Sequence, residues 1–303
     1  MKKKILAMLL CLTMILAVGC NSGESGEKTV TDRQGNEVAI PSEIETIIST
    51  APANTENLVA LGLADKIIAA DEYSADVEGL SESTELMNFT TPDAEAIIEL
   101  DPDIIVATEY SGSSEDPYKA VKDAGICVVY IPSSNSIEAI YEDITFLAEV
   151  FDVTDKGEEI ISSMKSDIDE IKEIGSKITD KKKVYFEIGP APNLYSFGNS
   201  TFLNEFIEIV GAENIFKDQE SWISPSSESV IDANPDIILT NVNYIENPID
   251  EIMSRDGWEN ITAVKDKAVY SIDTNSSSRP TPNAIKVLKE MAKAIYPDEY
   301  ADK

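Results

Sequence analysis

The segment TTPDAEAIIELDPDIIVAT, residues 90–108, contains a pattern that the chain uses twice. Residues 224–239 read SPSSESVIDANPDIIL, and a constant offset of 133 positions aligns the prolines, the glutamates and the PDII tetrapeptides of the two copies. In each copy Thr91 or Ser224 can cap a helix that has proline at its first position. The apolar PDII segment then enters a strand. The pattern therefore predicts a helix, a turn and a buried strand that occur once in each half of the chain.

Short apolar runs alternate with segments of helical periodicity around both copies. We predict strands at 44–49, 66–70, 103–108 and 126–131, and then at 183–189, 236–240 and 268–273. The helices between them are predicted at 54–62, 93–100 and 115–124, and then at 201–210, 226–233, 247–254 and 281–296. This alternation is typical of α/β units on a largely parallel sheet.

A single long segment, about 154–178, lies between the two series. Its apolar residues recur every three or four positions among Lys, Asp and Glu: Ile160, Ile161, Met164, Ile168, Ile171, Ile174 and Ile178. Such spacing predicts an amphipathic helix with one buried stripe. The predicted fold is therefore α/β, with two Rossmann-like lobes of largely parallel sheets joined by one long rigid helix and a ligand cleft between the lobes. We expect an N-terminal lobe at 29–153, the connecting helix at 154–179 and a C-terminal lobe at 180–303.

The N-terminus has the features of a secretion signal. In residues 1–20, three lysines precede an apolar run (5–18) that is short for a membrane span but typical of a signal-peptide core. The glycine before Cys20 resembles the lipobox of bacterial lipoproteins, although Leu16 stands four residues before the cysteine where the usual pattern has leucine three before it. We predict that Cys20 is lipidated, that 21–28 is a flexible tether, and that the body lies outside the cytoplasmic membrane.

Composition excludes several functions. The chain has 303 residues and a formal net charge of −32, so phosphate backbones would repel it and nucleic-acid binding is not expected. Histidine is absent, which excludes Ser-His-Asp and Cys-His catalysis and histidine-based metal ligation. Of three cysteines only Cys127 lies in the predicted body, in the apolar run GICVVY, where we expect a buried, inert thiol. The cysteines form no disulfide framework and no metal-binding spacing.

Two pairs of residues stand at equivalent positions in the copies. Glu95 and Glu228 are predicted to project from equivalent places on the two lobes; the alternative is a solvated glutamate near a helix N-terminus, worth about 0.3–1 kcal/mol. Phe89 and Trp222 each precede their glutamate by six residues. We interpret them as a pair lining the cleft, with core packing as the alternative.

Several segments in this order resemble the substrate-binding proteins of ABC importers that serve cobalamin, haem and ferric siderophores. They are TAPANTENLVALGL (50–63), EYSAD (72–76), the first copy, GAENIFKD (211–218) with Trp222, the second copy, and RPTP (279–282). Within this class the sequence is most similar to the cobalamin-binding members. The resemblance implies a non-enzymatic protein without a cofactor, whose partners are a small-molecule ligand, a permease and its ATPase.

The resemblance also implies roles for individual residues. It assigns ligand binding to Pro52, Ala53, Asn54, Tyr73, Phe89, Tyr195, Trp222 and Arg279, and docking onto permease arginines to Glu95 and Glu228. Phenylalanine and tyrosine stand at 89 and 195 where the best-known member has tryptophan and phenylalanine. No catalytic residue and no metal ligand are implied.

The expected ligand is a corrinoid, because aromatic faces with a few polar groups suit a broad, flat, amphipathic molecule. Anionic siderophores usually need more positive charge, and Arg279 is the one cleft cation that we predict. Haem would need Tyr or Met as its axial ligand. A siderophore- or haem-binding protein of the same class remains the alternative. An extracellular hydrolase is more remote, since no G-x-S-x-G motif occurs. A ligand sensor without a transport role is not separable from a transporter component by sequence.

Overall fold

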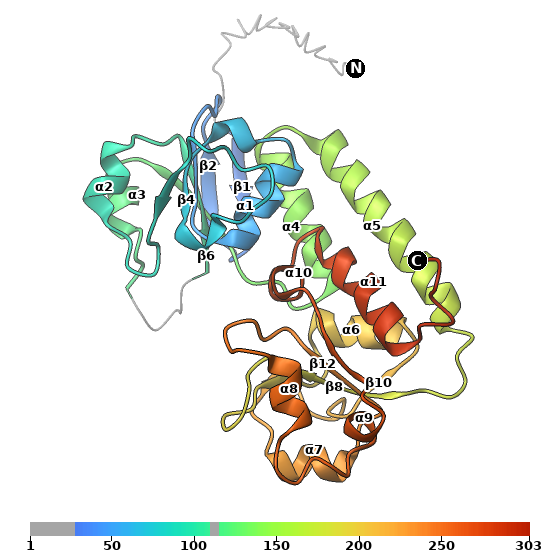
Figure 1. Ribbon diagram of the computed structural model, residues 1–303. Helices are drawn as coiled ribbons and strands as arrows, with labels where there is room; N and C mark the ends of the chain where they lie inside the picture. The colour runs from blue at the N-terminus through green and yellow to red at the C-terminus, as the bar shows by residue number, and fades with distance from the viewer. Residues whose placement is uncertain (1–27, 110–114) are drawn as a thin grey trace, which may run out of the picture.

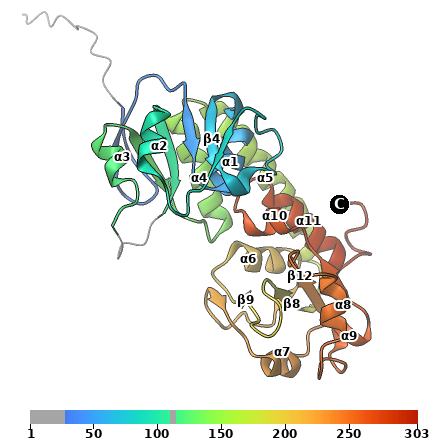
Figure 2. The same cartoon turned by 60° about the vertical axis from the view of Figure 1, so that its left-hand side comes forward.

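The computed structural model describes residues 28–109 and 115–303. The predicted signal peptide, Cys20 and the first seven residues of the predicted tether lie outside these ranges. Within them, no helix combines the length and the apolar character needed to cross a membrane. Two separate parallel sheets form the centres of two lobes, which lie one above the other in Figure 1 and are seen from a second side in Figure 2.

The N-terminal lobe is built on a five-stranded sheet of order β5-β4-β3-β6-β7, in which every neighbouring pair is parallel. Its strands are β3 (Ile47–Ser49), β4 (Ile67–Asp71), β5 (Glu85–Met87), β6 (Ile104–Thr108) and β7 (Cys127–Ile131). The helices of this lobe are α1 (Pro52–Ala60), α2 (Ala94–Glu99), α3 (Lys119–Asp123) and α4 (Ile137–Val150), with short 3₁₀ turns η1 (Ala64–Lys66) and η2 (Glu72–Ser74). An antiparallel hairpin, β1 (Lys28–Thr31) and β2 (Glu37–Ile40), precedes the sheet.

The C-terminal lobe is built on a four-stranded parallel sheet of order β10-β8-β12-β13. Its strands are β8 (Lys183–Glu187), β10 (Glu213–Asn214), β12 (Ile237–Thr240) and β13 (Val269–Ser271). A separate antiparallel pair is formed by β9 (Ser196–Phe197) and β11 (Trp222–Ile223). The helices are α6 (Phe202–Ile209), α7 (Ser227–Ala233), α8 (Pro248–Met253), α9 (Thr262–Lys265), α10 (Thr274–Ser278) and α11 (Ala284–Ile295). The α/β fold with two lobes of parallel strands is confirmed.

The repeated segment forms the same unit in both lobes. Helices α2 and α7 begin at equivalent positions, 94 and 227, and strands β6 and β12 begin at 104 and 237. After each helix the chain turns through a left-handed residue, Asp101 with φ 47° and Asn234 with φ 48°. Each of these strands lies beside the strand that comes first in the sequence of its parallel sheet, β3 or β8, as expected for a buried PDII segment.

The predicted helix caps are wrong by two residues. The caps are Asp93, whose carboxylate accepts hydrogen bonds from the backbone N–H groups of Glu95 and Ala96, and Ser226, whose hydroxyl accepts from the N–H of Ser229. Thr91 therefore lies outside the helix, as does Ser224 in the second copy. A side-chain oxygen at the true cap satisfies N–H groups of the first turn that have no partner within the helix.

The connecting helix α5 spans Thr154–Gly175 and runs alongside both lobes in Figures 1 and 2. Its predicted apolar stripe is confirmed, since Met164, Ile168 and Ile171 are buried and the remaining isoleucines of the stripe are half-buried. The stripe packs on α4, α6 and α11. At its end Gly175 approaches the backbone of α6 so closely that a Cβ there would lie 2.1 Å from the carbonyl oxygen of Ile209. The helix is therefore held against both lobes along its length.

Candidate ligand cleft

A cavity of about 340 Å³ is lined by residues of both lobes. The N-terminal lobe supplies the start of α1, Tyr73, Thr108 and the segment after β7, and the C-terminal lobe supplies 278–280. The lining residues are Ala51, Pro52, Ala53, Asn54, Asn57, Tyr73, Thr108, Ile131, Pro132, Ser133, Asp143, Ser278, Arg279 and Pro280. The structure thus brings together five of the eight predicted ligand-binding residues, namely Pro52, Ala53, Asn54, Tyr73 and Arg279.

Strand β3 places the N-terminal wall of this cavity, because it leads directly into α1 with Pro52 at the first helical position. A chain of buried hydroxyls then fixes the neighbouring turn. The hydroxyl of Thr55 lies 2.8 Å from that of Ser49 in β3 and 3.0 Å from that of Ser74 in η2. The η2 turn carries Tyr73, whose ring is 67% exposed beside α1. An aromatic face is therefore presented to the cleft from a rigid base.

Arg279 forms ion pairs that link the two lobes, so it is not an unpaired cation of the cleft. Its guanidinium donates to the carboxylate of Glu56 in α1 at 2.8 Å, to that of Asp76 at 2.9 Å and to the carbonyl oxygen of Tyr73 at 3.1 Å. The side chain is only 12% exposed. In this structure carboxylates of the N-terminal lobe already neutralise the arginine, and its predicted contact with a ligand stays a prediction.

Other side chains of the C-terminal lobe donate hydrogen bonds to the same two carboxylates of the N-terminal lobe. Thr281 donates to Glu56 at 2.6 Å and Asn283 donates to it at 3.0 Å. Asn275 donates to Asp76 at 2.7 Å. Burial alone would raise the pKa of Asp76, but the hydrogen bonds from Arg279 and Asn275 outweigh it and lower that pKa. Sequence reasoning missed Glu56 and Asp76, since nothing in their local pattern indicates partners more than 190 positions away.

The antiparallel pair β9 and β11 presents an aromatic platform on the C-terminal lobe. The ring of Tyr195 stacks on that of Trp222 with centroids 6.2 Å apart and an interplanar angle of 15°. Phe197 is buried beneath and meets Trp222 edge-on at 6.1 Å. Tyr195 and Trp222 are 39% and 43% exposed. They do not line the cavity at α1, so the predicted site is divided between that cavity and this platform.

Phe89 is buried, whereas Trp222, its equivalent in the repeat, is exposed. Its side chain is 9% exposed and packs in the core of the N-terminal lobe with Ile48, Ile97 and Tyr130 among others. The structure therefore does not support Phe89 as a ligand contact, and the core-packing alternative describes it. The reason is local: Phe89 follows an edge strand of the main sheet, whereas Trp222 belongs to a small pair outside its sheet.

Glu95 and Glu228 stand in the first turns of α2 and α7 and are exposed. Within the described part of the chain neither carboxylate has a hydrogen-bond or ion-pair partner. The two helices lie on different lobes and are well separated in both views of the molecule (Figures 1 and 2). The equivalence expected from the repeat is thus present in the helices that carry these residues.

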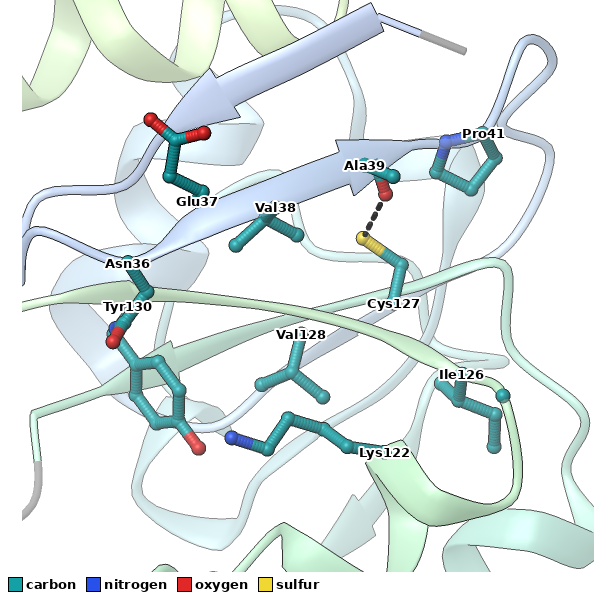
Figure 3. A pocket seen from close by; sticks show the side chains of 11 residues that line it. Asn36, Glu37, Val38, Ala39, Pro41, Lys122, Ile126, Cys127, Val128 and Tyr130 are labelled. Carbon is teal, nitrogen blue, oxygen red and sulfur yellow. Dashed lines mark hydrogen bonds between the residues drawn. The ribbon is translucent and has the colours of Figure 1, made fainter.

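A second cavity, of about 660 Å³, lies between β2 and β7 and shares no lining residue with the cleft (Figure 3). Cys127 lines it and donates its S–H to the carbonyl oxygen of Ala39 at 3.5 Å. Burial raises the pKa of this thiol to about 11, so it is protonated and unreactive at neutral pH. The thiol is half-buried where full burial was predicted. Among the described residues, no cluster of three or more acidic or cysteine side chains could hold a metal ion.

The comparison with known proteins identifies the fold and the class. A family model for periplasmic binding proteins matches residues 47–275. This chain is a member of that family. It is 32% identical to an uncharacterized ABC transporter substrate-binding lipoprotein, YvrC, of Bacillus subtilis, over 98% of this chain and 97% of the relative.

Two further relatives are informative. The vitamin B12-binding protein of Vibrio parahaemolyticus is 26% identical, over 82% of this chain and 88% of its own. The crystal structure of a possible iron-binding (periplasmic solute-binding) protein of Staphylococcus epidermidis has a TM-score of 0.75 and 30% identity, covering 84% of this chain and 99% of that one. The periplasmic binding protein described here is thus a solute-binding protein and not an enzyme. It needs no cofactor of its own, and its partners are a small-molecule solute and an ABC permease with its ATPase.

Proposed function

We propose that this periplasmic binding protein captures a corrinoid outside the cytoplasmic membrane and delivers it to an ABC permease. The observation that carries the proposal is the stacked, exposed pair Tyr195 and Trp222 on one lobe, with Tyr73 and the uncapped start of α1 on the other. Flat aromatic faces with few free charges suit a broad amphipathic macrocycle. The resemblance to the vitamin B12-binding protein of Vibrio parahaemolyticus supports the same ligand.

The electrostatics of the cleft favour a neutral ligand. Arg279 is paired with Glu56 and Asp76, so the cleft has no unpaired cation among its described lining residues. An anionic ferric siderophore would have to displace these carboxylates from the arginine or remain uncompensated. A corrinoid with its own axial base needs no ligand from the protein, which agrees with the absence of histidine.

Delivery is proposed to use Glu95 and Glu228, which present one exposed carboxylate on each lobe for arginines of the permease. Lipidation of Cys20 is proposed to hold the protein at the membrane, as the lipoprotein name of the Bacillus relative suggests. Both proposals follow from the sequence resemblance.

Calorimetric titration of the protein with cobalamin, haem and a ferric siderophore tests the ligand. We expect saturable binding of cobalamin and weaker or no binding of the other two. Tight binding of haem or of the siderophore without binding of cobalamin would transfer the proposal to the second candidate, an iron-compound carrier. That candidate is favoured by the name of the Staphylococcus structure, a possible iron-binding protein.

A further inference from the structure

The side-chain amide oxygen of Asn57, in the second turn of α1, is buried and has no hydrogen-bond partner among the described residues. The side chain lines the cleft cavity and the residue is 2% exposed, yet its Oδ1 accepts no hydrogen bond from any described residue. Buried polar atoms in folded proteins are almost always hydrogen-bonded, and an exception calls for a functional explanation. Because this amide is at the wall of a cavity, a bound molecule can supply the missing partner.

The charged side chains of the cavity lining, Asp143 and Arg279, are already paired. Both carboxylate oxygens of Asp143 accept hydrogen bonds, one from Arg33 at 2.7 Å and the other from Ser134 at 2.5 Å. Arg279 is held by carboxylates and by the carbonyl oxygen of Tyr73. Among the described residues, Oδ1 of Asn57 is therefore the fully buried side-chain atom of the cavity lining that still lacks a hydrogen-bond partner.

The start of α1 supplies donors next to this amide. The helix has nine residues, and its cap Ala51 has no side-chain oxygen to accept from the first turn. The backbone N–H groups of Ala53 and Asn54 have no acceptor among the described residues. Helical side chains lean towards the N-terminus, so Asn57 projects over the turn that contains Ala53 and Asn54. One face of α1 thus combines N–H donors at the positive end of the helix with the Asn57 amide.

This combination selects a neutral group that both donates and accepts. A carboxylate offers no hydrogen to Oδ1 of Asn57, and an ammonium offers no acceptor to the N–H groups of α1. A primary carboxamide offers both, with its carbonyl oxygen towards the helix and its N–H towards Asn57. The absence of an unpaired charge in the described lining agrees with a neutral group.

We propose that Asn57 and the N-terminus of α1 form a subsite for a primary carboxamide of the transported solute. This inference deepens the proposed function and rests on it, because a corrinoid carries such amides around the edge of its macrocycle. The subsite fixes which edge of the solute enters the cavity at α1, while the aromatic platform of Tyr195 and Trp222 contacts its face.

A first experiment tests the subsite without any corrinoid. Propionamide and propionate are titrated into the full chain labelled with nitrogen-15, and the side-chain amide signals of Asn57 are assigned by their loss in Asn57→Leu. We expect propionamide to shift these signals and propionate to leave them unchanged. Equal responses to both probes, or no response to propionamide, would overturn the subsite.

A second experiment tests its use in transport. We expect Asn57→Leu to bind cobalamin at least ten-fold more weakly than the wild type, and Asn260→Leu, which replaces an exposed asparagine outside the cavity, to bind it equally well. Equal affinity of Asn57→Leu and the wild type would overturn the inference while leaving the proposed function intact. If the wild type responds to propionamide but does not bind cobalamin, the carboxamide subsite is supported and the proposal of a corrinoid ligand is contradicted. Should Asn57→Leu not fold, Asn57→Ala replaces it in both experiments, since it also removes the amide oxygen that is proposed to accept from the carboxamide.

Discussion

Nη1 of Arg279 lies 2.8 Å from Oε1 of Glu56, although the two residues are 223 positions apart in the chain. The pair joins the C-terminal lobe to helix α1 of the N-terminal lobe, and both side chains are largely buried. Hydrogen bonds from Thr281 and Asn283 add to it on the side of Glu56. A buried charge that loses its partner is costly, whereas a neutral replacement of both partners is tolerated.

Replacing Arg279 alone should therefore destabilise the protein more than replacing both Glu56 and Arg279. We expect Arg279→Met to lower the free energy of unfolding by about 3 kcal/mol, because Glu56 would keep a buried, uncompensated charge. The double variant Glu56→Gln/Arg279→Met should recover most of that loss. Urea denaturation of the two variants and the wild type measures both effects. Equal destabilisation in the single and double variants would show that the pair is not coupled in this way.

The docking role of Glu95 and Glu228 has a matched control within the same helices. Glu99 and Asp232 are also exposed, also equivalent in the repeat, and lie near the other ends of α2 and α7. We expect Glu95→Ala/Glu228→Ala to abolish solute uptake by cells while leaving solute affinity and stability unchanged. Glu99→Ala/Asp232→Ala should leave uptake intact. Loss of solute affinity in the first variant would contradict docking, as would uptake at the wild-type rate.

Phe89 and Tyr73 should respond in opposite ways to truncation. Because Phe89 is buried in the core, Phe89→Ala is expected to lower the free energy of unfolding by about 3–5 kcal/mol. Tyr73 is exposed at the cleft, so Tyr73→Ala should leave stability nearly unchanged and weaken solute binding. Denaturation and calorimetric titration of both variants give the two readouts. A stable Phe89→Ala with impaired binding would restore the ligand role that the sequence suggested.

Because the pKa of Asp273 is lowered in the folded protein, we expect this residue to contribute to the free energy of unfolding at neutral pH and to lose that contribution in acid. It caps α10 and pairs with Lys286 at 2.7 Å. Burial would raise the pKa of Asp273, but hydrogen bonds from Lys286 and Ser276 outweigh it and lower that pKa to about 2. A carboxyl with a lowered folded-state pKa stabilises the fold above its unfolded-state value, and that contribution is lost as the pH falls through the folded-state value.

The measurement is the stability difference between the wild type and Asp273→Asn as a function of pH. We expect the wild type to be more stable at pH 7, by an amount of the order of 2 kcal/mol at most. The difference should decline below about pH 4 and disappear only as the pH falls below about 2. A difference that stays constant over this range would exclude the charge of Asp273 as its cause.

The sequence predicted those features that local patterns determine. The repeat predicted the helix and strand of each lobe, and three- and four-residue spacing predicted the stripe of α5, because both depend on neighbours within a few positions. Helix α4 was missed although Ser136 caps it through the N–H of Ala139. Eight of its fourteen residues are buried, so its apolar surface is too broad to give a clear one-sided pattern.

The site was predictable only where it lies on local structure. The start of α1 and Tyr73 are close in the chain and meet at one wall, as expected. Whether Arg279 faces a ligand or Glu56 depends on how the lobes meet, and no local pattern carries that information. The burial of Phe89 and the exposure of Trp222 likewise depend on which sheet each residue lies against, so equivalent positions in the repeat do not ensure equivalent roles.

The central claim is that the cleft binds a corrinoid against Trp222, and a fluorescence titration of the wild type and Trp222→Ala with cobalamin tests it most directly. The second tryptophan, Trp258, is buried in the C-terminal lobe and remains as a reporter in the variant. We predict saturable quenching of the wild type with one cobalamin per chain. In Trp222→Ala we predict a dissociation constant about ten-fold higher, which corresponds to about 1.4 kcal/mol of lost stacking. Absence of saturable quenching by cobalamin, or equal affinity in the two proteins, would contradict the account.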